Sequence, residues 1–499
     1  MNRALVCVVF LACQSAPQPK PEQTPPPPKA EAAPAPEPVL EAPKLRLPPG
    51  AKPLAQSLDL RVVPGEDTFT GATVIDVEVS QPLDVLWLNA THLTPSAATV
   101  GGAPAKVKVV GENHLALIPP KPLQPGTTQV KLQYTGVLSK KDTGGLFQLK
   151  EGDQSYAYTH FEPLDARRAF PCFDEPAFKI PWAITLRHLP SHLAFANQPV
   201  ASTTVEAGVQ VTVFKPTLAL PSYLVAMAVG PFDVVDGGRW GKNKVPLKLI
   251  TPKGKGPDAR YAVENTGPIL EQLEAYFGIA YPYEKLDSIS LPVNTGAMEN
   301  PGLVTYGHQL MLSRVAEDTP GRQRAYASVC AHELAHQWFG DLVTMAWWDD
   351  LWLNEAFATW MTTKVVAAWK PKWDADVLAT QRRSGALGSD GLANARQVRQ
   401  PITANDDIVN AFDGITYGKG ASVISMFESW VTPAAFQKGV KRYLEQHAHG
   451  NATAADFLAA ISAEAGKDVS APFATFLDQP GAPRVAMELV CPKGPSPRP

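Results

Sequence analysis

Apolar and polar residues alternate along short segments between about residues 55 and 235. The period-two pattern is clearest at residues 58–62, 75–79, 107–109, 130–134 and 211–213. Successive side chains of a strand point to opposite faces of a sheet, so this alternation predicts strands with one buried face. Gly, Pro and Asn separate the segments, as turns between strands require. We therefore expect a sandwich-like β domain at residues 54–240.

The pattern changes to helical spacing after about residue 242. Ile269, Leu270, Leu273 and Phe277 share one face of a helix expected at residues 262–277. Pro268 falls within that segment and is expected to bend or restart the helix. Further helices are predicted at residues 325–339, 353–366, 421–430, 433–447 and 454–465. The chain is thus expected to be a multidomain α+β protein, with a mainly helical domain at residues 241–485.

The first 13 residues have the form of an export signal. Arg3 precedes an apolar run at residues 4–12, which is far below the ~18–20 residues that span a bilayer. Leu11-Ala12-Cys13 is similar to the end of a bacterial lipoprotein signal, in which the cysteine is lipidated. An ordinary secretory signal with an incidental cysteine is the alternative.

Residues 14–53 favour the lipoprotein, because this Pro-rich segment is typical of a disordered tether. We predict an exported protein, held as a lipoprotein in a bacterial envelope by an anchor at Cys13 and otherwise secreted.

Composition excludes some classes of function. The 499 residues include 45 basic and 48 acidic ones, a formal net charge of -3. A protein that binds nucleic acid usually shows a basic surplus or basic clusters, so no nucleic-acid partner is expected. Beyond the leader, Cys172, Cys330 and Cys491 are too few and too widely spaced for a disulfide framework.

Two histidines in the second domain have the spacing of a metal site. His332 and His336 are four residues apart in a predicted helix, so their imidazoles project from one face and can share a Zn²⁺ ion. Glu333 directly follows the first histidine and is suited to act as general base toward a metal-activated water. Two unrelated histidines on a helix would give the same spacing.

A third ligand would distinguish a zinc site from two unrelated histidines. Glu355 follows His336 by 19 residues and is the sole acidic residue between positions 351 and 364, in an apolar, helix-compatible segment. A buried carboxylate needs a cationic partner, and a metal ion supplies one. We therefore predict one Zn²⁺ per chain, bound by His332, His336 and Glu355.

These segments resemble the gluzincin aminopeptidases, the family of aminopeptidase N and leukotriene hydrolase. Gly296-Ala297-Met298-Glu299-Asn300 is similar to the family's exopeptidase signature, and Tyr417-Gly418-Lys419-Gly420 to the segment that carries its catalytic tyrosine. Residues 161–176, 281–287 and 347–355 extend the resemblance, which spans about residues 55–490. It implies a thermolysin-like catalytic domain. We expect the C-terminal helical domain of long members to be absent, with a short tail at residues 486–499.

The resemblance also implies roles for single residues. Glu299 and Glu162 would bind the free α-ammonium group of a peptide through charge-assisted hydrogen bonds. Tyr417 would donate a hydrogen bond to the oxyanion formed during hydrolysis. The remaining members of the signature would bind the peptide, and the smallest of them would let its backbone approach closely. They are Gly296, Ala297, Met298 and Asn300. The expected activity is that of a zinc aminopeptidase acting on peptides with a free N-terminus.

Other functions remain as alternatives. An endopeptidase would use the same zinc chemistry, but Glu162 and Glu299 argue against it. A non-enzymatic peptide-binding module would have the same fold, but every expected ligand and catalytic residue is present. Epoxide hydrolysis, as in leukotriene hydrolase, is a further activity that the resemblance allows.

Overall fold

The computed structural model describes residues 40–293, 296–483 and 485–490. The predicted export signal, most of the predicted linker, Cys13 and Cys491 lie outside these residues, so the lipid anchor stays a prediction. Within the described part, Cys172 and Cys330 are both buried free thiols. None of the described helices is long and apolar enough to cross a membrane.

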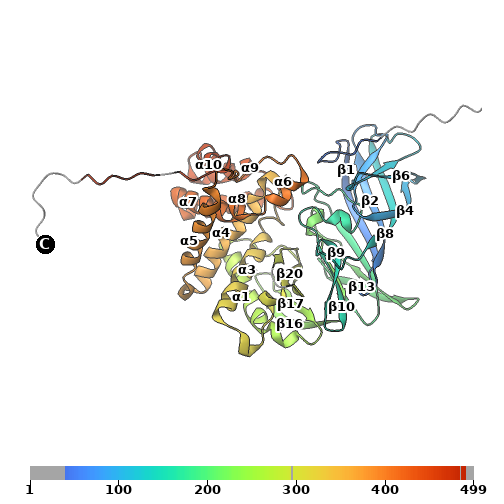
Figure 1. Cartoon of the computed structure of the whole chain (residues 1–499), viewed down its shortest axis with the longest axis horizontal. Coiled ribbons are helices and arrows are strands. Elements are labelled where there is room, and N and C mark those ends of the chain that lie inside the picture. The colour runs from blue at the N-terminus through green and yellow to red at the C-terminus, as the bar shows by residue number, and fades with distance from the viewer. Residues whose placement is uncertain (1–39, 294–295, 484, 491–499) are drawn as a thin grey trace, which may run out of the picture. The chain divides into compact units, whose positions relative to one another are not determined.

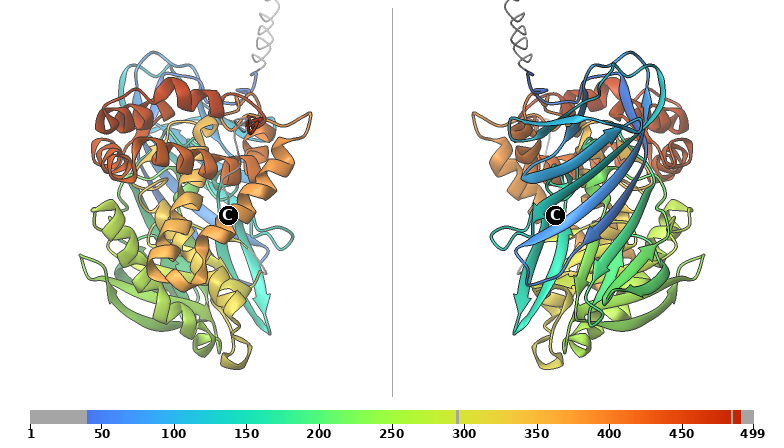
Figure 2. Two further views of the ribbon diagram at one scale, coloured as in Figure 1. Left: turned by 90° about the vertical axis from the view of Figure 1, so that its left-hand side faces the viewer. Right: turned by 90° about the vertical axis from the view of Figure 1, so that its right-hand side faces the viewer.

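A large sheet forms most of the N-terminal half (Figure 2, right). Its strands are, in spatial order, β13 (Val200–Glu206), β14 (Val209–Phe214), β11 (Trp182–His188), β1 (Ala51–Arg61), β2 (Thr68–Val79), β8 (Gly126–Val137), β4 (Leu93–Val100) and β5 (Ala103–Pro104). Neighbouring strands are antiparallel except for β1 and β11, which run parallel. The alternation read from the sequence is present, since residues of β2, and of β1 from Gln56 onward, are buried at every second position.

Smaller sheets complete the β domain. One contains β3 (Leu86–Asn89), β7 (His114–Ile118) and β6 (Lys106–Val110), and another contains β12 (Leu193–Ala196), β15 (Met227–Gly230), β10 (Gln154–His160) and β9 (Gly145–Glu151). Leu86 and Leu115 of the first share one hydrophobic cluster with Leu58 and Ile75 of the large sheet. Two sheets with a common core form the predicted sandwich-like arrangement.

A mixed sheet opens the second half of the chain. Its strands are, in spatial order, β16 (Phe232–Trp240), β17 (Val245–Pro252), β18 (Leu286–Leu291), β20 (Leu303–Gly307) and β19 (Ala297–Met298). The boundary expected at residue 240 falls between β16 and β17, which pair with each other. The sheet ends at β19, so one edge of β19 carries no neighbouring strand among the described residues.

Helices make up the rest of the second half (Figure 1). They are α1 (Arg260–Phe277), α2 (His308–Met311), α3 (Pro320–His336), α4 (Trp352–Trp369), α5 (Ala375–Asp390), α6 (Asn405–Asn410), α7 (Gly420–Val431), α8 (Pro433–Gln446), α9 (Ala454–Ala465) and α10 (Ser470–Leu477). A short parallel pair, β21 (Thr344–Met345) and β22 (Asn451–Ala452), joins α9 to the region after α3. The β-then-helical order confirms the predicted fold class, although α1 continues through Pro268 instead of restarting there.

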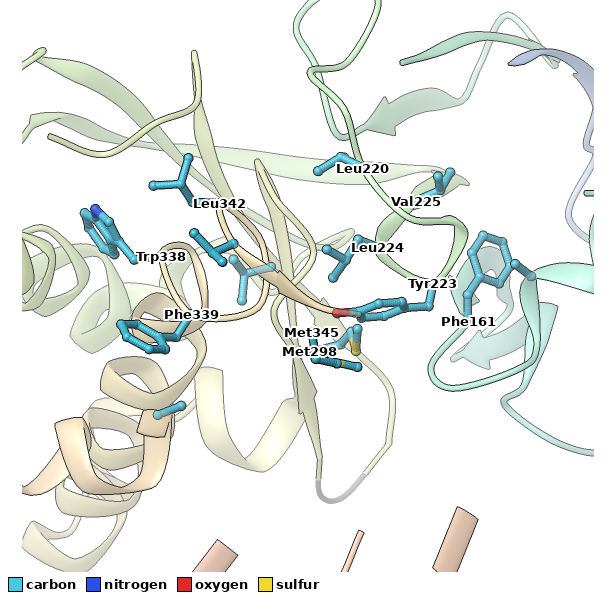
Figure 3. Close-up of a cluster of buried hydrophobic side chains, with 14 of the residues drawn as sticks. Phe161, Leu220, Tyr223, Leu224, Val225, Met298, Trp338, Phe339, Leu342 and Met345 are labelled. Atoms are coloured by element: carbon cyan, nitrogen blue, oxygen red, sulfur yellow. The ribbon is translucent and has the colours of Figure 1, made fainter. Parts of the chain in front are cut away.

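One hydrophobic cluster connects the two halves of the chain (Figure 3). Phe161 and Leu224 come from the β domain, whereas Met298, Phe339 and Met345 come from the second half, and all five are buried in that cluster. The end of α3, the strand β19 and the segment after β10 are therefore packed against a common core. Close packing of this kind leaves side chains little freedom to shift.

Candidate active site

Three side chains with metal-binding atoms meet where α3 and α4 face each other. The Nε2 atoms of His332 and His336 are 3.1 Å apart, and the Glu355 carboxylate lies 3.3 Å from the first and 3.5 Å from the second. His336 and Glu355 are buried, and His332 borders a cavity. Residues four apart on α3 project from one face, which explains how both imidazoles reach the same carboxylate.

Packing between the two helices fixes this geometry. The rings of Phe339, just after α3, and Phe357, on α4, stack with their centroids 3.4 Å apart and 7° between their planes. The backbone carbonyl of Phe339 also accepts a 3.0 Å hydrogen bond from Nδ1 of His336. That bond leaves the Nε2 lone pair of His336 directed at the other two donors, as a metal ligand requires.

The three donors suit a divalent metal such as zinc. Ligands about 2.0–2.1 Å from a tetrahedral zinc ion lie roughly 3.3 Å from one another, close to the separations of these three atoms. Burial acts to raise the pKa of Glu355, but His336 and His332 outweigh burial and lower it, so the carboxylate stays ionised. Two imidazoles and one carboxylate form a donor set that zinc commonly uses, and metal binding would displace any proton from their Nε2 atoms.

A second acidic cluster shares Glu355 with the first. Carboxylate oxygens of Glu162, Glu299 and Glu355 all lie within 4.8 Å of one another. Glu162 lies two residues after the end of β10 in the β domain, and Glu299 directly follows β19. One buried oxygen of Glu162 and one of Glu299 have no hydrogen-bond partner. Burial and then the charges of Glu299 and Glu355 raise the pKa of Glu162 well above its usual range. Crowded carboxylates that keep unpartnered buried oxygens form a site that favours a cation.

The rest of the predicted peptide-binding segment lies at the edge of the mixed sheet. Ala297 and Met298 form β19 and pair with Tyr306 and Thr305 of β20. Gly296 has a φ of +97°, a conformation that favours glycine. The side chain of Met298 is buried in the cluster of Figure 3.

Asn300 ends the same segment. Its side chain is buried, and its Nδ2 has no hydrogen-bond partner among the described residues.

Glu333 and Tyr417 line a cavity of about 390 Å³ beside His332. Burial and then the charge of Glu299 raise the pKa of Glu333 well above its usual range, so this carboxylate readily accepts a proton. The ring of Tyr417 is nearly parallel to that of His332, with centroids 6.0 Å apart. Burial and then the charge of Glu355 raise the pKa of Tyr417, so its hydroxyl keeps the proton that it can donate.

Tyr417 is held by contacts that its sequence motif does not contain. It lies in a π-helical turn, Ile415–Lys419, and its backbone N–H donates to the carbonyl of Asp413 at 3.1 Å. The Asp413 side chain accepts from the backbone N–H of Ile415 at 2.8 Å and is itself paired with Arg396. A local Asp-x-Ile pattern was the available signal for this turn, whereas Arg396 is 17 residues away from its partner.

Gln337 is a second residue that sequence reasoning missed. Its side-chain amide donates to the backbone carbonyl of Glu299 at 2.6 Å and to that of Glu333 at 3.3 Å. Its oxygen accepts a 3.3 Å hydrogen bond from the hydroxyl of Tyr281. Gln337 therefore joins the helix that carries His332 and His336 to the segment directly after β19. Its position directly after His336 was the one clue in the sequence.

Comparisons with known proteins agree with this architecture. The family description "Peptidase M1 N-terminal domain" matches residues 52–224, and "Peptidase family M1 domain" matches residues 261–476. Among curated proteins, Aminopeptidase M1-A of Oryza sativa subsp. japonica is 36% identical over 435 residues, which cover 84% of this chain and 49% of that protein.

Relatives from other kingdoms give similar values. Aminopeptidase 2, mitochondrial, of Saccharomyces cerevisiae is 34% identical over 434 residues, and Glutamyl aminopeptidase of Bos taurus is 34% identical over 442 residues. Each alignment covers 84% of this chain and 45% of the relative. The chain thus spans about half the length of the curated relatives it matches. The resemblance read from the motifs is confirmed, and the chain belongs to peptidase family M1.

Proposed function

We propose that this chain is a zinc aminopeptidase that hydrolyses the N-terminal peptide bond of peptides with a free α-ammonium group. The observation that carries the proposal is that Glu355 belongs to two clusters. One is the cluster of metal donors with His332 and His336, and the other is the acidic cluster with Glu162 and Glu299. An ammonium group bound by the acidic cluster would lie about the length of one amino-acid residue from the metal donors. The peptide bond next to the free N-terminus therefore meets the metal site.

His332, His336 and Glu355 would hold the zinc ion. Bound zinc would polarise the scissile carbonyl and make a water molecule more acidic. Relatives of this chain include aminopeptidases, which supports the same chemistry here.

Glu162 and Glu299 set the position of the substrate. Their unpartnered buried oxygens accept hydrogen bonds from the α-ammonium group, and its charge relieves the repulsion between the two carboxylates. The free edge of β19 offers backbone groups of Ala297 to the peptide, which adds to the sheet as a further strand. A peptide with a blocked N-terminus lacks the charge and leaves both carboxylates unpaired.

Glu333 and Tyr417 carry out the proton chemistry. Glu333 takes a proton from the attacking water and passes it to the nitrogen of the leaving amine. Glu333 borders the cavity beside His332, where that water would lie. Tyr417 keeps its proton and donates a hydrogen bond to the carbonyl oxygen as negative charge develops there.

Matched substrates test the proposal. Alanine arylamide and its N-acetylated form differ in the ammonium group alone, and each is assayed with and without a chelator. We expect hydrolysis of the free form, loss of that activity on chelation, and at least a hundredfold lower kcat/KM for the acetylated form, as expected when charged hydrogen bonds are lost.

Variants show whether the discrimination comes from the acidic pair. Glu299→Gln and Glu162→Gln should each lower the ratio of free to acetylated turnover by roughly tenfold to hundredfold. Glu274→Gln is the matched control, because Glu274 is also buried but accepts from the backbone N–H groups of Tyr281 and Lys242 instead. Equal turnover of free and acetylated substrates by the unaltered chain would favour an endopeptidase. Zinc binding without any turnover would favour a peptide-binding module.

A further inference from the structure

We propose that Arg382 binds a carboxylate at the C-terminus of the substrate, so that the preferred substrates are di- and tripeptides with a free C-terminus. This inference rests on the proposed function, because it uses the register that Glu162 and Glu299 impose on the peptide. It adds a recognition element for the leaving part of the substrate.

The cavity beside His332 is placed to receive that leaving part. Its wall includes His332, Glu333, Tyr417 and Arg382, whereas Glu162 does not border it. A peptide whose ammonium group lies at the acidic pair and whose first carbonyl lies over the metal donors continues past His332 into this space. The volume of about 390 Å³ falls at the small end of ligand pockets, which suits one or two residues.

Arg382 lies on the turn of α5 that packs against the catalytic tyrosine's segment. A Cβ atom built on Gly418, the neighbour of Tyr417, would be 3.5 Å from the carbonyl oxygen of Arg382 and 2.9 Å from Cβ of Ala386. Arg382, His332 and Tyr417 all line the cavity of about 390 Å³. The guanidinium therefore belongs to the same cavity as the reacting groups.

No carboxylate in the described part of the chain pairs with Arg382. Its side chain is exposed at the rim of the cavity, and within the described residues it makes neither an ion pair nor a hydrogen bond. The surrounding protein atoms lower its pKa, and no acidic side chain opposes that effect. It also borders a neighbouring cavity with Asp376 and Glu428, but neither is within ion-pair distance of it. By contrast, Arg396 is paired with Asp413. A guanidinium that borders the cavity without a described partner is available to an anionic ligand, and its fork matches a carboxylate.

The cleft is therefore polarised to match a short zwitterionic peptide. Carboxylates of Glu162 and Glu299 face the amino end, and the guanidinium of Arg382 faces the other end. A longer peptide places a neutral amide at Arg382 and loses a charge-assisted contact.

Kinetics on three peptides tests the proposal. Ala-Ala-Ala is compared with its C-terminal amide and with Ala-Glu amide, which carries its carboxylate on a side chain. Alanine arylamide, which has no carboxylate, reports on catalysis alone. For the unaltered chain we expect kcat/KM for the free acid to exceed that for the amide by roughly tenfold to hundredfold, mainly through KM. The same preference should appear in the binding of the two peptides to Glu333→Gln, measured by calorimetry.

Variants on one turn of α5 test whether Arg382 causes the preference for the free acid. Arg382→Gln should bring the ratio of acid to amide close to one while changing arylamide turnover by no more than about twofold. Arg382→Lys should keep part of the ratio, because it retains the charge but not the fork. Arg383→Gln is the control, because Arg383 borders other cavities, and it should keep the full preference.

Several results would overturn the inference. Equal kcat/KM for acid and amide, a preference that survives in Arg382→Gln, or equal loss in Arg383→Gln would each exclude a specific contact. A preference for Ala-Glu amide over Ala-Ala-Ala would assign Arg382 to an acidic side chain instead. Absence of arylamide hydrolysis by the unaltered chain would refute the proposed function itself, which is a separate outcome.

Discussion

Gln337 donates a 2.6 Å hydrogen bond from its side-chain amide to the backbone carbonyl of Glu299. The bond links the residue after His336, a proposed metal ligand, to the residue proposed to bind the substrate's ammonium group. Both partners are buried, so the distance between the two halves of the site depends on a contact that solvent cannot replace.

Gln337→Met keeps the length of the side chain and removes this bond. We expect the free energy of unfolding to fall by about 1–3 kcal/mol, because a buried carbonyl loses its donor. We also expect KM for free-amine substrates to rise and the discrimination against acetylated substrates to weaken. Urea unfolding and the kinetics of the matched arylamides measure the two effects.

Gln437→Met provides the control for that substitution. Gln437 donates a 2.7 Å hydrogen bond to the backbone carbonyl of Tyr276. Neither residue belongs to the candidate active site. Its replacement should lower stability to a similar or smaller extent and leave the discrimination unchanged. If both variants changed discrimination equally, Gln337 would be a structural residue without a positioning role.

Tyr417 should act through its hydroxyl, with Asp413 positioning it. We expect Tyr417→Phe to lower kcat by roughly 10²–10³-fold with unchanged metal content, since the lost hydrogen bond acts on the transition state. Asp413→Ala should lower kcat less, because the Tyr417 hydroxyl remains and only the turn that Asp413 anchors is loosened. In the double variant the losses should not multiply. Fully multiplicative losses, measured as kcat, would show that Asp413 acts independently of Tyr417.

Lys179 makes stability depend on pH in a direction that can be measured. Its Nζ donates to the backbone carbonyls of Asp341 at 2.8 Å, Leu342 at 3.1 Å and Gly450 at 3.1 Å. Burial lowers its pKa from 10.5 to about 7, against the opposing effect of Asp341. Between these two values the unfolded chain binds a proton that the folded chain does not. The contribution of Lys179 to stability therefore increases as pH rises from about 7 toward 10.5.

Lys179→Met removes the titrating group. We expect the stability of the unaltered chain relative to this variant to increase between pH 7 and pH 10, by up to about 1.4 kcal/mol per pH unit. Chemical unfolding of both proteins across that range measures the difference, and Lys441→Met, at an exposed ion pair, serves as control. A difference that stays constant with pH would mean that the three carbonyls hold the ammonium form throughout.

Helices and strands were predicted correctly where the residues that determine them are close together in the sequence. The helix expected at residues 454–465 has those bounds in α9, where Thr453 and Asp456 form a capping box. The mixed sheet of the second half was not predicted. All six residues of β18 are buried, so alternation is absent there, and β19 has two residues.

Residues of the candidate site were likewise predictable only where a local pattern relates them. The spacing of His332 and His336 is a property of one helix, and it could be read directly. Glu162 lies 170 positions before His332, and no local pattern relates them, so it came from the resemblance alone. Arg382 lies on a mostly exposed helix, where an unpaired arginine looks like any surface residue until the cavity is known.

The metal site is the claim on which all the others depend. Crystals of the zinc-loaded protein, measured just above and just below the zinc absorption edge, locate the metal without reference to activity. We predict one anomalous peak per chain, about 2.0–2.1 Å from Nε2 of His332, Nε2 of His336 and a carboxylate oxygen of Glu355. A folded protein with no zinc peak at these three side chains, or with its zinc bound elsewhere, would contradict the account.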